Sequence, residues 1–132
     1  NIYGSDYPTA DGTAIRDYLH VSDLADAHVV ALRYLGGGGA SDAFNLGTGV
    51  GHSVRQVVKM VEQVACKKLP VQESGRRSGD PACLVADASK AARVLNWRPQ
   101  HSSLEQIVRT AWEWRLKANG IVNQYDTSAS SA

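Results

Sequence analysis

The six residues Gly75–Asp80, GRRSGD, place two arginines and a carboxylate among glycines. An arginine guanidinium can donate two parallel hydrogen bonds to phosphate oxygens, and glycine lets the backbone approach a ligand closely. The carboxylate of Asp80 is suited to accept hydrogen bonds from sugar hydroxyls. The loop therefore predicts binding of a sugar phosphate or a nucleotide. The alternative is that Arg77 and Asp80 pair with each other on the surface.

Two residues outside this loop fit the same chemistry. Arg16 stands at a predicted junction between a loop and a strand, between Ile15 and Asp17, where a guanidinium could reach a phosphate. Tyr3 could stack on a nucleobase. Together with Gly75–Asp80, they supply cations, a hydroxyl acceptor and an aromatic surface.

The four histidines predict neither a catalytic set nor a metal site. His28 lies on the apolar side of a predicted helix and is expected to be buried, and His20 is expected to make a structural hydrogen bond rather than act as a base. His52 and His101 fall in predicted loops, and their spacing is not that of metal ligands.

The segment Gly47–His52, GTGVGH, follows an apolar run and precedes a predicted helix, as a phosphate-binding turn would. It lacks the G-x-G-x-x-G spacing and the acidic residue that follows it in dinucleotide-binding folds. We therefore interpret the segment as a tight turn between a strand and a helix.

Composition restricts the class of protein. The 132 residues are enough for one domain, and 43% of them are hydrophobic, as in a globular protein. The formal charge of +1 creates no field that would attract nucleic acid, and no apolar run approaches the ~20 residues that span a bilayer. Cys66 and Cys83 form no metal or redox motif. We expect Cys66 to be a buried free thiol and the protein to be cytoplasmic.

Hydrophobic periodicity and capping residues predict an α/β chain with few, short strands. Strand segments are expected at 1–3, 16–21, 43–48, 69–74 and 83–86. Helices are expected to begin at Ser22, Ser53, Asp87 and Ser103, which are residue types that cap helices. So small a sheet would be most stable as part of a larger partner domain or packed against one.

The first predicted helix, from Ser22 to about Leu35, carries an apolar stripe that should face the core. The stripe comprises Leu24, His28, Ala31, Leu32 and Leu35. Four glycines, Gly36–Gly39, should end this helix in a surface loop.

Five segments resemble, in order and spacing, the UDP-galactose 4-epimerases, also called UDP-glucose 4-epimerases, of the extended short-chain dehydrogenase/reductase family. They are DYPTADGTAIRDYLHVSDLADAHVVAL, FNLGTGVGHSV, GRRSGD, ADASKAARVLNW and AWEW. The resemblance covers about residues 1–119, and the first segment is its most specific part.

This resemblance implies a two-part enzyme, in which an N-terminal Rossmann domain binds NAD and a smaller C-terminal α/β domain binds the UDP-sugar. Residues 1–119 resemble the C-terminal domain, and the polar tail 120–132 is expected to be disordered. The sequence starts at Asn1 without an initiator methionine, so we expect it to begin within a longer protein. Its expected partners are the UDP-sugar, its own N-terminal Rossmann domain and, in the whole enzyme, a second copy.

The family's catalytic groups have no counterpart in this sequence. In the family, a Tyr-x-x-x-Lys tyrosine removes the 4-hydroxyl proton while NAD accepts the C4 hydride, and the ketosugar turns before the hydride returns. Neither that pair nor the glycine-rich NAD fingerprint occurs here. The resemblance therefore assigns no catalytic residue, and the chain alone should be inactive.

The resemblance does imply a UDP-sugar site in this chain. The matching residues are Asn1, Ile2, Tyr3, Arg16, Arg77, Ser78, Gly79, Asp80 and Leu84. Arg16 and Arg77 would bind the diphosphate, and Asp80 would bind the ribose. Segment 1–3 would meet the uracil, with Tyr3 as its aromatic wall, and Arg76 is expected in a structural or outer position.

Leu84 departs from the family's pattern, because relatives often carry tyrosine or cysteine at this position of the hexose pocket. Leucine is smaller than tyrosine and donates no hydrogen bond. We therefore expect the intact enzyme to tolerate a bulkier 2-substituent, such as N-acetyl, on the sugar.

Two other functions stay open. The chain could belong to a sister enzyme, such as a UDP-xylose or UDP-glucuronate 4-epimerase or a nucleotide-sugar dehydratase. It could also be a non-catalytic module with a structural or binding role in a larger assembly.

Overall fold

Short strands and helices make up the chain in a computed structural model that describes residues 1–120. In chain order the elements are β1 (Ile2–Tyr3), β2 (Ile15–Asp17), α1 (Val21–Gly36), β3 (Gly51–Ser53), α2 (Val54–Ala65), β4 (Glu73–Ser74), β5 (Cys83–Leu84), α3 (Ser89–Val94) and α4 (Leu104–Ala118). The predicted α/β class, with short strands and packed helices, is confirmed.

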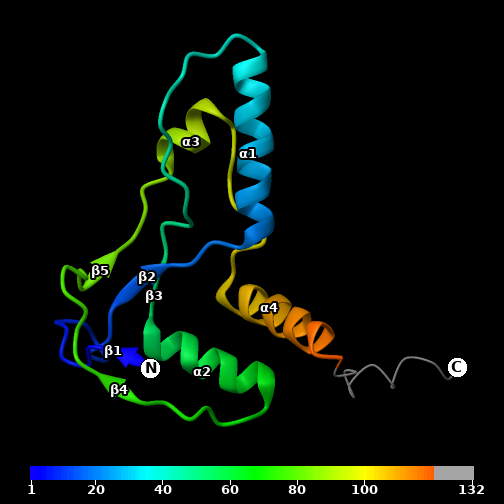
Figure 1. The fold of residues 1–132 in the computed structure, drawn as a ribbon. Coiled ribbons are helices and arrows are strands. Elements are labelled where there is room, and N and C mark those ends of the chain that lie inside the picture. The colour runs from blue at the N-terminus through cyan, green and yellow to red at the C-terminus, as the bar shows by residue number, and fades with distance from the viewer. Residues whose placement is uncertain (121–132) are drawn as a thin grey trace, which may run out of the picture.

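Two small sheets join distant parts of the chain (Figure 1). In one, β2 lies between β3, to which it is antiparallel, and β5, to which it is parallel, and Arg16 is paired with Leu84. In the other, β1 runs parallel to β4, with Tyr3 opposite Ser74. The second sheet therefore places the first residues of the chain beside the loop Gly75–Asp80, which follows β4.

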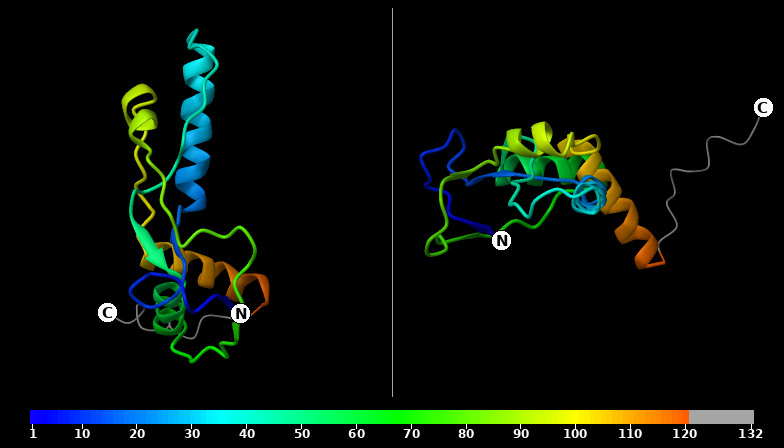
Figure 2. Two further views of the ribbon diagram at one scale, coloured as in Figure 1. Left: turned by 90° about the vertical axis from the view of Figure 1, so that its left-hand side faces the viewer. Right: turned by 90° about the horizontal axis from the view of Figure 1, so that it is seen from above.

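The elements gather in two groups at opposite ends of an elongated molecule. α1 and α3 lie at one end, while α2 and α4 pack against each other at the other end, near β1 and β4 (Figure 1 and Figure 2). The sheet of β2, β3 and β5 lies between the two groups.

The core of the first group forms around Trp97, which is 4% exposed and packs with Ala27, Ala91 and Leu95. Half-buried side chains surround this cluster: Leu19, Val30, Ala31, Tyr34, Phe44, Leu46 and Ala88. Trp97 is central to the stability of this end, because an aromatic side chain buries roughly 150–250 Å².

The prediction that the apolar stripe of α1 faces the core is wrong for most of the residues in that stripe. The exposed ones are Leu24, His28, Leu32 and Leu35. Leu32 shows 69% of its surface, and the His28 Nδ1 lies 2.7 Å from the Leu24 carbonyl oxygen instead of in a core. The buried face of α1 lies around Ala27, which packs on Trp97. α1 thus carries apolar side chains on two faces, and the small alanine allows the closer approach to the indole ring.

Capping residues fix the starts of three helices. Ser53 accepts a hydrogen bond from the Gln56 N–H, and the Ser53 N–H donates to the Gln56 side chain, which completes a capping box for α2. Ser103 caps α4 as predicted. The N-cap of α1 is His20 rather than Ser22, and the His20 Nδ1 accepts a hydrogen bond from the Ser22 N–H. The structural hydrogen bond predicted for His20 is thereby confirmed.

Two predictions at other helix ends are wrong. Cys66 is exposed rather than buried; it is the C-cap of α2 and adopts the left-handed conformation, with φ of 50°. Asp87 is not the cap of α3; Ala88 holds that position, and the Asp87 carboxylate accepts a hydrogen bond from the Ser89 N–H.

The buried strand predicted at 43–48 is also wrong, since the structure assigns no strand there. Phe44 and Leu46 alternate as strand residues do, and both pack on the Trp97 cluster. However, no strand among residues 1–120 pairs with this segment, and a strand becomes stable through such pairing. The predicted strand at 16–21 is instead β2, which starts and ends earlier, and only the last two residues of 69–74 form β4.

The predicted domain end at residue 119 coincides with the C-cap of α4, Asn119. The predicted disordered tail lies, from residue 121 onward, outside the described residues. None of the helices in the described part of the chain is long and apolar enough to cross a membrane.

Candidate nucleotide-sugar site

Arg16 and Asp80 form an ion pair that joins β2 to the end of the loop Gly75–Asp80. The parallel pairing of β2 with β5, the strand after this loop, brings the two residues together. Their side chains are 21% and 30% exposed, so the pair is partly shielded from water. Arg77 bonds to Asp80 only through the main chain, where the Asp80 N–H donates to the Arg77 carbonyl oxygen at 3.3 Å. The alternative of a side-chain pair between these two residues is therefore wrong.

Arg77 lies over the ring of Tyr3, with its guanidinium carbon 3.9 Å from the ring centroid. Such a cation–π contact contributes roughly 0.5–1 kcal/mol at an exposed site. The loop arginine and the predicted aromatic wall are therefore neighbours, because β1 and β4 pair side by side.

The remaining residues of the two segments differ in accessibility. Ser78 and Gly79 are exposed at the tip of the loop, where Gly79 has φ of +76°. Asn1 is exposed, whereas Ile2 is only 3% exposed. The Ile2 side chain thus belongs to the interior, and it can serve the site only by fixing the position of β1.

A hollow of about 590 Å³ opens beside Arg16 and Leu84, which face each other across β2 and β5. Its other polar and aromatic lining comes from Asp17, Phe44, Asn45 and Asp87. Leu84 is 60% exposed and leaves an apolar patch on the wall. The volume lies within the range of small-molecule sites. Sequence reasoning missed Phe44, Asn45 and Asp87, although all three lie in the segments that carry the family resemblance.

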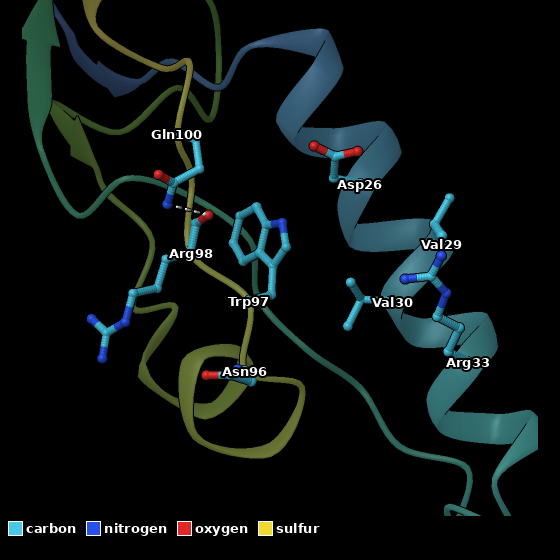
Figure 3. A pocket seen from close by; sticks show the side chains of 8 residues that line it. All are labelled: Asp26, Val29, Val30, Arg33, Asn96, Trp97, Arg98 and Gln100. Carbon is cyan, nitrogen blue, oxygen red and sulfur yellow. Dashed lines mark hydrogen bonds between the residues drawn. The ribbon is translucent and has the colours of Figure 1, made fainter.

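A second hollow lies between α1 and the segment 96–100, with Trp97 at its base and Asp26, Arg33 and Arg98 around it (Figure 3). None of the predicted site residues lines it. Nearby, Asp23, Asp26 and His101 lie within 4.8 Å of one another. Both Asp23 oxygens already accept hydrogen bonds, so this carboxylate holds the chain together instead of facing a ligand.

Asp17 fixes the glycine turn that begins at Gly47, which follows an apolar run as a phosphate-binding turn would. Its carboxylate accepts hydrogen bonds from the N–H groups of Thr48, Gly49 and Ala86 and from the Thr48 hydroxyl. Burial alone would raise the pKa of Asp17, but these hydrogen bonds outweigh it and hold the pKa below its ordinary value. Because Asp17 occupies the amides at Thr48 and Gly49, the turn is structural. It precedes β3, so it joins a coil to a strand and not a strand to a helix.

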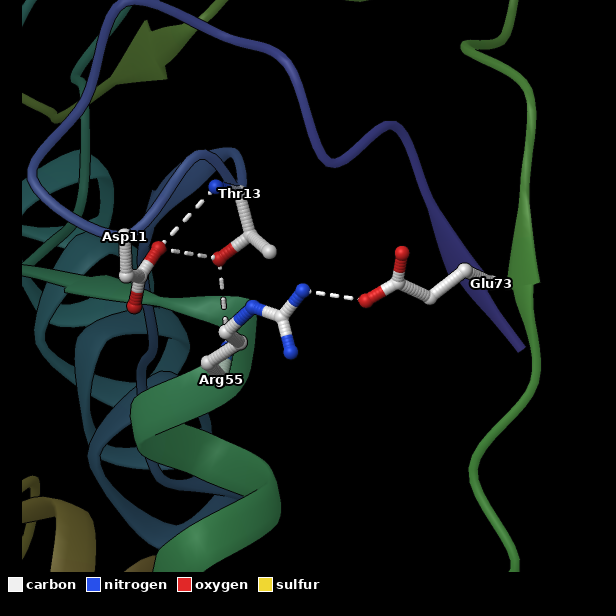
Figure 4. A network of polar contacts seen from close by, with 4 residues as sticks. All are labelled: Asp11, Thr13, Arg55 and Glu73. Atoms are coloured by element: carbon white, nitrogen blue, oxygen red, sulfur yellow. Dashed lines mark hydrogen bonds and ion pairs between the residues drawn. The ribbon is translucent and has the colours of Figure 1, made fainter.

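A second polar network lies near β4, the strand that precedes the loop Gly75–Asp80 (Figure 4). Asp11 accepts hydrogen bonds from the N–H and the hydroxyl of the fully buried Thr13, at 2.9 and 2.7 Å. The Thr13 hydroxyl in turn accepts from the Arg55 N–H, and the Arg55 guanidinium pairs with Glu73 of β4. This network joins the start of α2 to β4 and thereby fixes where the loop Gly75–Asp80 begins.

Comparison with known proteins relates most of the chain to one family. The profile of the family described as GDP-mannose 4,6 dehydratase matches residues 4–111. A curated relative, the UDP-glucose 4-epimerase of Rhizobium leguminosarum bv. trifolii, is 52% identical over 118 residues, which are 89% of this chain and 36% of the relative.

Solved structures of related proteins show the same similarity to UDP-glucose 4-epimerases. The UDP-glucose 4-epimerase of Brucella ovis in complex with NAD is similar with a TM-score of 0.78 and 47% identity, over 83% of this chain and 34% of that one. The enzyme of Stenotrophomonas maltophila, with bound NAD and formylated UDP-arabinopyranose, gives a TM-score of 0.83 and 43% identity, over 90% and 35% of the two chains. The present chain thus spans about a third of the length of the proteins it matches.

Proposed function

The chain belongs to the GDP-mannose 4,6 dehydratase family, and on this premise we propose that it is the UDP-sugar-binding portion of a UDP-glucose 4-epimerase. One observation carries the proposal: Asp80 pairs with Arg16, and Arg77, three residues before Asp80 in the same loop, lies over the Tyr3 ring. Two cations, a carboxylate and an aromatic ring match a diphosphate, a ribose and a base. The names of the relatives support the choice of UDP-glucose within this chemistry.

In this proposal, Arg16 and Arg77 bind the diphosphate and Asp80 accepts hydrogen bonds from the ribose. A guanidinium has five N–H donors, so Arg16 can bind a phosphate while it keeps its contact with Asp80. Arg77 is exposed and can turn from the Tyr3 ring, which frees that ring for uracil. Each charge-assisted contact contributes about 1.5–3 kcal/mol.

This arrangement fits a reaction in which the sugar must turn while its carrier stays fixed. The charged residues hold the nucleotide, which is remote from the reacting carbon, and their binding energy orients the sugar. Leu84, beside Arg16, offers the sugar an apolar surface without a hydrogen bond that would hold one orientation.

We propose that NAD, the proton-transferring groups and the Rossmann domain belong to the rest of a longer protein. The glycine turn at 47–49 does not fit a pyrophosphate, because the amides of Thr48 and Gly49 donate to Asp17. No tyrosine in the sequence is followed by lysine four residues later. The contribution of residues 1–119 is therefore to bind and orient the substrate, and the isolated chain is expected to be inactive.

The test is the interconversion of UDP-galactose and UDP-glucose by the natural gene product that contains these residues, with UDP binding measured by calorimetry. We expect the protein to interconvert the two sugars and to bind UDP. Both activities should be lost together when Arg16 and Arg77 are replaced. A gene product that binds no UDP would refute it. Turnover by the 132-residue chain alone would refute its assignment to substrate binding only.

A sister UDP-sugar epimerase is the second candidate, favoured by one observation. Leu84 is 60% exposed beside the hollow at Arg16, and a related epimerase has been solved with a UDP-arabinopyranose derivative. Parallel assays with UDP-N-acetylgalactosamine and UDP-xylose separate the two candidates, since the preferred substrate has the highest kcat/KM.

A further inference from the structure

We propose that Arg76 positions the loop Gly75–Asp80 for nucleotide binding by anchoring it on Tyr7 and Asp6. The inference rests on the proposed function, because it takes Arg77 and Asp80 as the residues that hold the UDP group. Arg76 is a positioning residue here, which acts through its neighbours and binds no phosphate itself.

Arg76 crosses from the loop to the segment that follows β1. Its Nε donates to the Asp6 carboxylate at 2.7 Å, and its Nη2 donates to the Asp6 carbonyl oxygen. The guanidinium carbon lies 4.3 Å from the centroid of the Tyr7 ring. The two adjacent arginines therefore diverge, with Arg77 over Tyr3 and Arg76 over Tyr7.

Tyr7 contacts both ends of the loop. It is only 5% exposed, and its main chain is fixed by the hydrogen bond from the Tyr7 N–H to the Gly12 carbonyl oxygen at 2.9 Å. Its ring supports Arg76 near the start of the loop, while its hydroxyl donates to the Asp80 carbonyl oxygen at the end, at 3.4 Å. One buried side chain thus contacts both ends of the loop.

Gly4 shows that this packing is close. It has φ of +83°, and a Cβ at this position would collide with the Tyr7 ring and lie 2.9 Å from the Arg76 Cγ. Only glycine lets the end of β1, the ring and the arginine meet in this way.

Besides the contacts of Arg76, the loop is held by the Arg77–Tyr3 contact, the Arg16–Asp80 pair and the hydrogen bond from the Asp80 N–H to the Arg77 carbonyl oxygen. Its residues from Gly75 to Gly79 are all exposed, and exposed segments with few buried contacts open readily. If Arg76 were lost, a nucleotide would have to order the loop as it bound, and affinity would fall by that cost. Chemistry at the sugar would be unaffected, so KM should rise while kcat stays unchanged.

A substitution of Asp6 can distinguish a positioning role of Arg76 from direct phosphate binding by Arg76. Its side chain is 74% exposed, so Asp6→Ala should leave the fold intact. If Arg76 acts by anchoring the loop, removing its partner weakens UDP binding. If Arg76 binds phosphate directly, Asp6→Ala leaves the Arg76 guanidinium without its carboxylate partner, and UDP binding stays unchanged or becomes tighter.

The experiment compares Arg76→Gln, Asp6→Ala and Tyr7→Phe in the natural gene product, with the Kd for UDP measured by calorimetry beside KM and kcat. We expect Arg76→Gln and Asp6→Ala to raise Kd and KM by about three- to tenfold with kcat within about twofold. Tyr7→Phe, which removes only the hydroxyl, should give a smaller rise of about twofold. Arg76→Lys should restore part of the affinity, because it keeps the charge beside Asp6.

Arg109→Gln is the matched control, since Arg109 also forms an exposed arginine–carboxylate pair, with Glu105 on α4. It should leave Kd for UDP unchanged. An unchanged Kd in both Arg76→Gln and Asp6→Ala would overturn the inference, as would tighter binding by Asp6→Ala. A wild-type protein that binds no UDP would instead refute the proposed function. Should Arg76→Gln fail to fold, the exposed Asp6→Ala variant and Tyr7→Phe decide alone.

Discussion

Asp80 pairs with Arg16, which precedes it by 64 residues, and not with Arg77, which precedes it by three. The pair is partly shielded from water, whereas the Arg77 guanidinium lies over the Tyr3 ring. Asp80 thereby orients Arg16 in the free protein. The same carboxylate lowers the positive charge that a diphosphate would meet.

Replacing Arg16 and replacing Asp80 should affect UDP binding differently. Arg16→Met would remove the proposed phosphate contact and is expected to weaken binding by about 10- to 100-fold, since a charge-assisted hydrogen bond contributes about 1.5–3 kcal/mol. Asp80→Asn keeps an oxygen for the ribose and should cost about tenfold or less. Calorimetry with UDP at two salt concentrations measures both, and equal losses would contradict the assigned division of roles.

Asp23 should be the most sensitive carboxylate for stability. Its side chain is 1% exposed and accepts hydrogen bonds from the N–H groups of Gln100 and His101 and from the Ser102 hydroxyl. Asp23→Ala leaves these donors unpaired and is expected to cost about 3–5 kcal/mol of unfolding free energy. Asp26→Ala, at an exposed site one turn along α1, should change it by less than about 0.5 kcal/mol. Denaturant unfolding of the two variants provides the test.

Asp17 should make stability fall in acid. Burial raises its pKa, but the hydrogen bonds from Thr48, Gly49 and Ala86 outweigh burial and leave the folded-state pKa below the ordinary value. Its contribution is therefore fully present above the unfolded pKa, about 4, and is lost as pH falls through the lower, folded pKa.

Asp17→Asn tests this contribution. The variant places an amide NH₂ against N–H donors, and we expect a loss of about 1–3 kcal/mol at neutral pH. Its thermal stability should also depend less on pH between about 5 and 2 than that of the wild type. Parallel pH dependences for the two proteins would show that Asp17 does not contribute in this way.

Leu84→Tyr should narrow the range of sugars. The exposed leucine leaves room beside Arg16, and a tyrosine would fill that space. We expect kcat/KM for UDP-N-acetylgalactosamine to fall by about tenfold while that for UDP-galactose changes by less than about threefold. Leu84→Met, which keeps an apolar side chain of similar volume, is the control. Unchanged activity of Leu84→Tyr on the N-acetylated sugar would reject the hypothesis.

Local features were the ones that the sequence predicted well. The caps at Ser53 and Ser103 depend on residues three positions away in the chain, and both were predicted. The partner of Asp80 depends on the pairing of β2 with β5, which no local pattern reveals. Proximity in sequence favoured Arg77 instead.

α1 illustrates a different limit. Its 3.6-residue periodicity predicts a helix, but apolar residues occupy two faces, and only the tertiary contact with Trp97 selects the face around Ala27. Asp23 lies in the first turn of α1, where the helix dipole favours an anion. The structure shows that it also binds the main chain before α4, a contact between residues 77 positions apart.

The parallel pairing of β2 with β5 has a consequence for the order of folding. A ribosome adds about 5–20 residues per second, so Asp80 follows Arg16, 64 residues earlier, by about 3–13 s. During that interval α1, β3 and α2 have already been made, and β2 has only β3 as a neighbour. The contact between Arg16 and Asp80 can therefore form only after α1, β3 and α2 have been made, and it can do so before α3 and α4 follow.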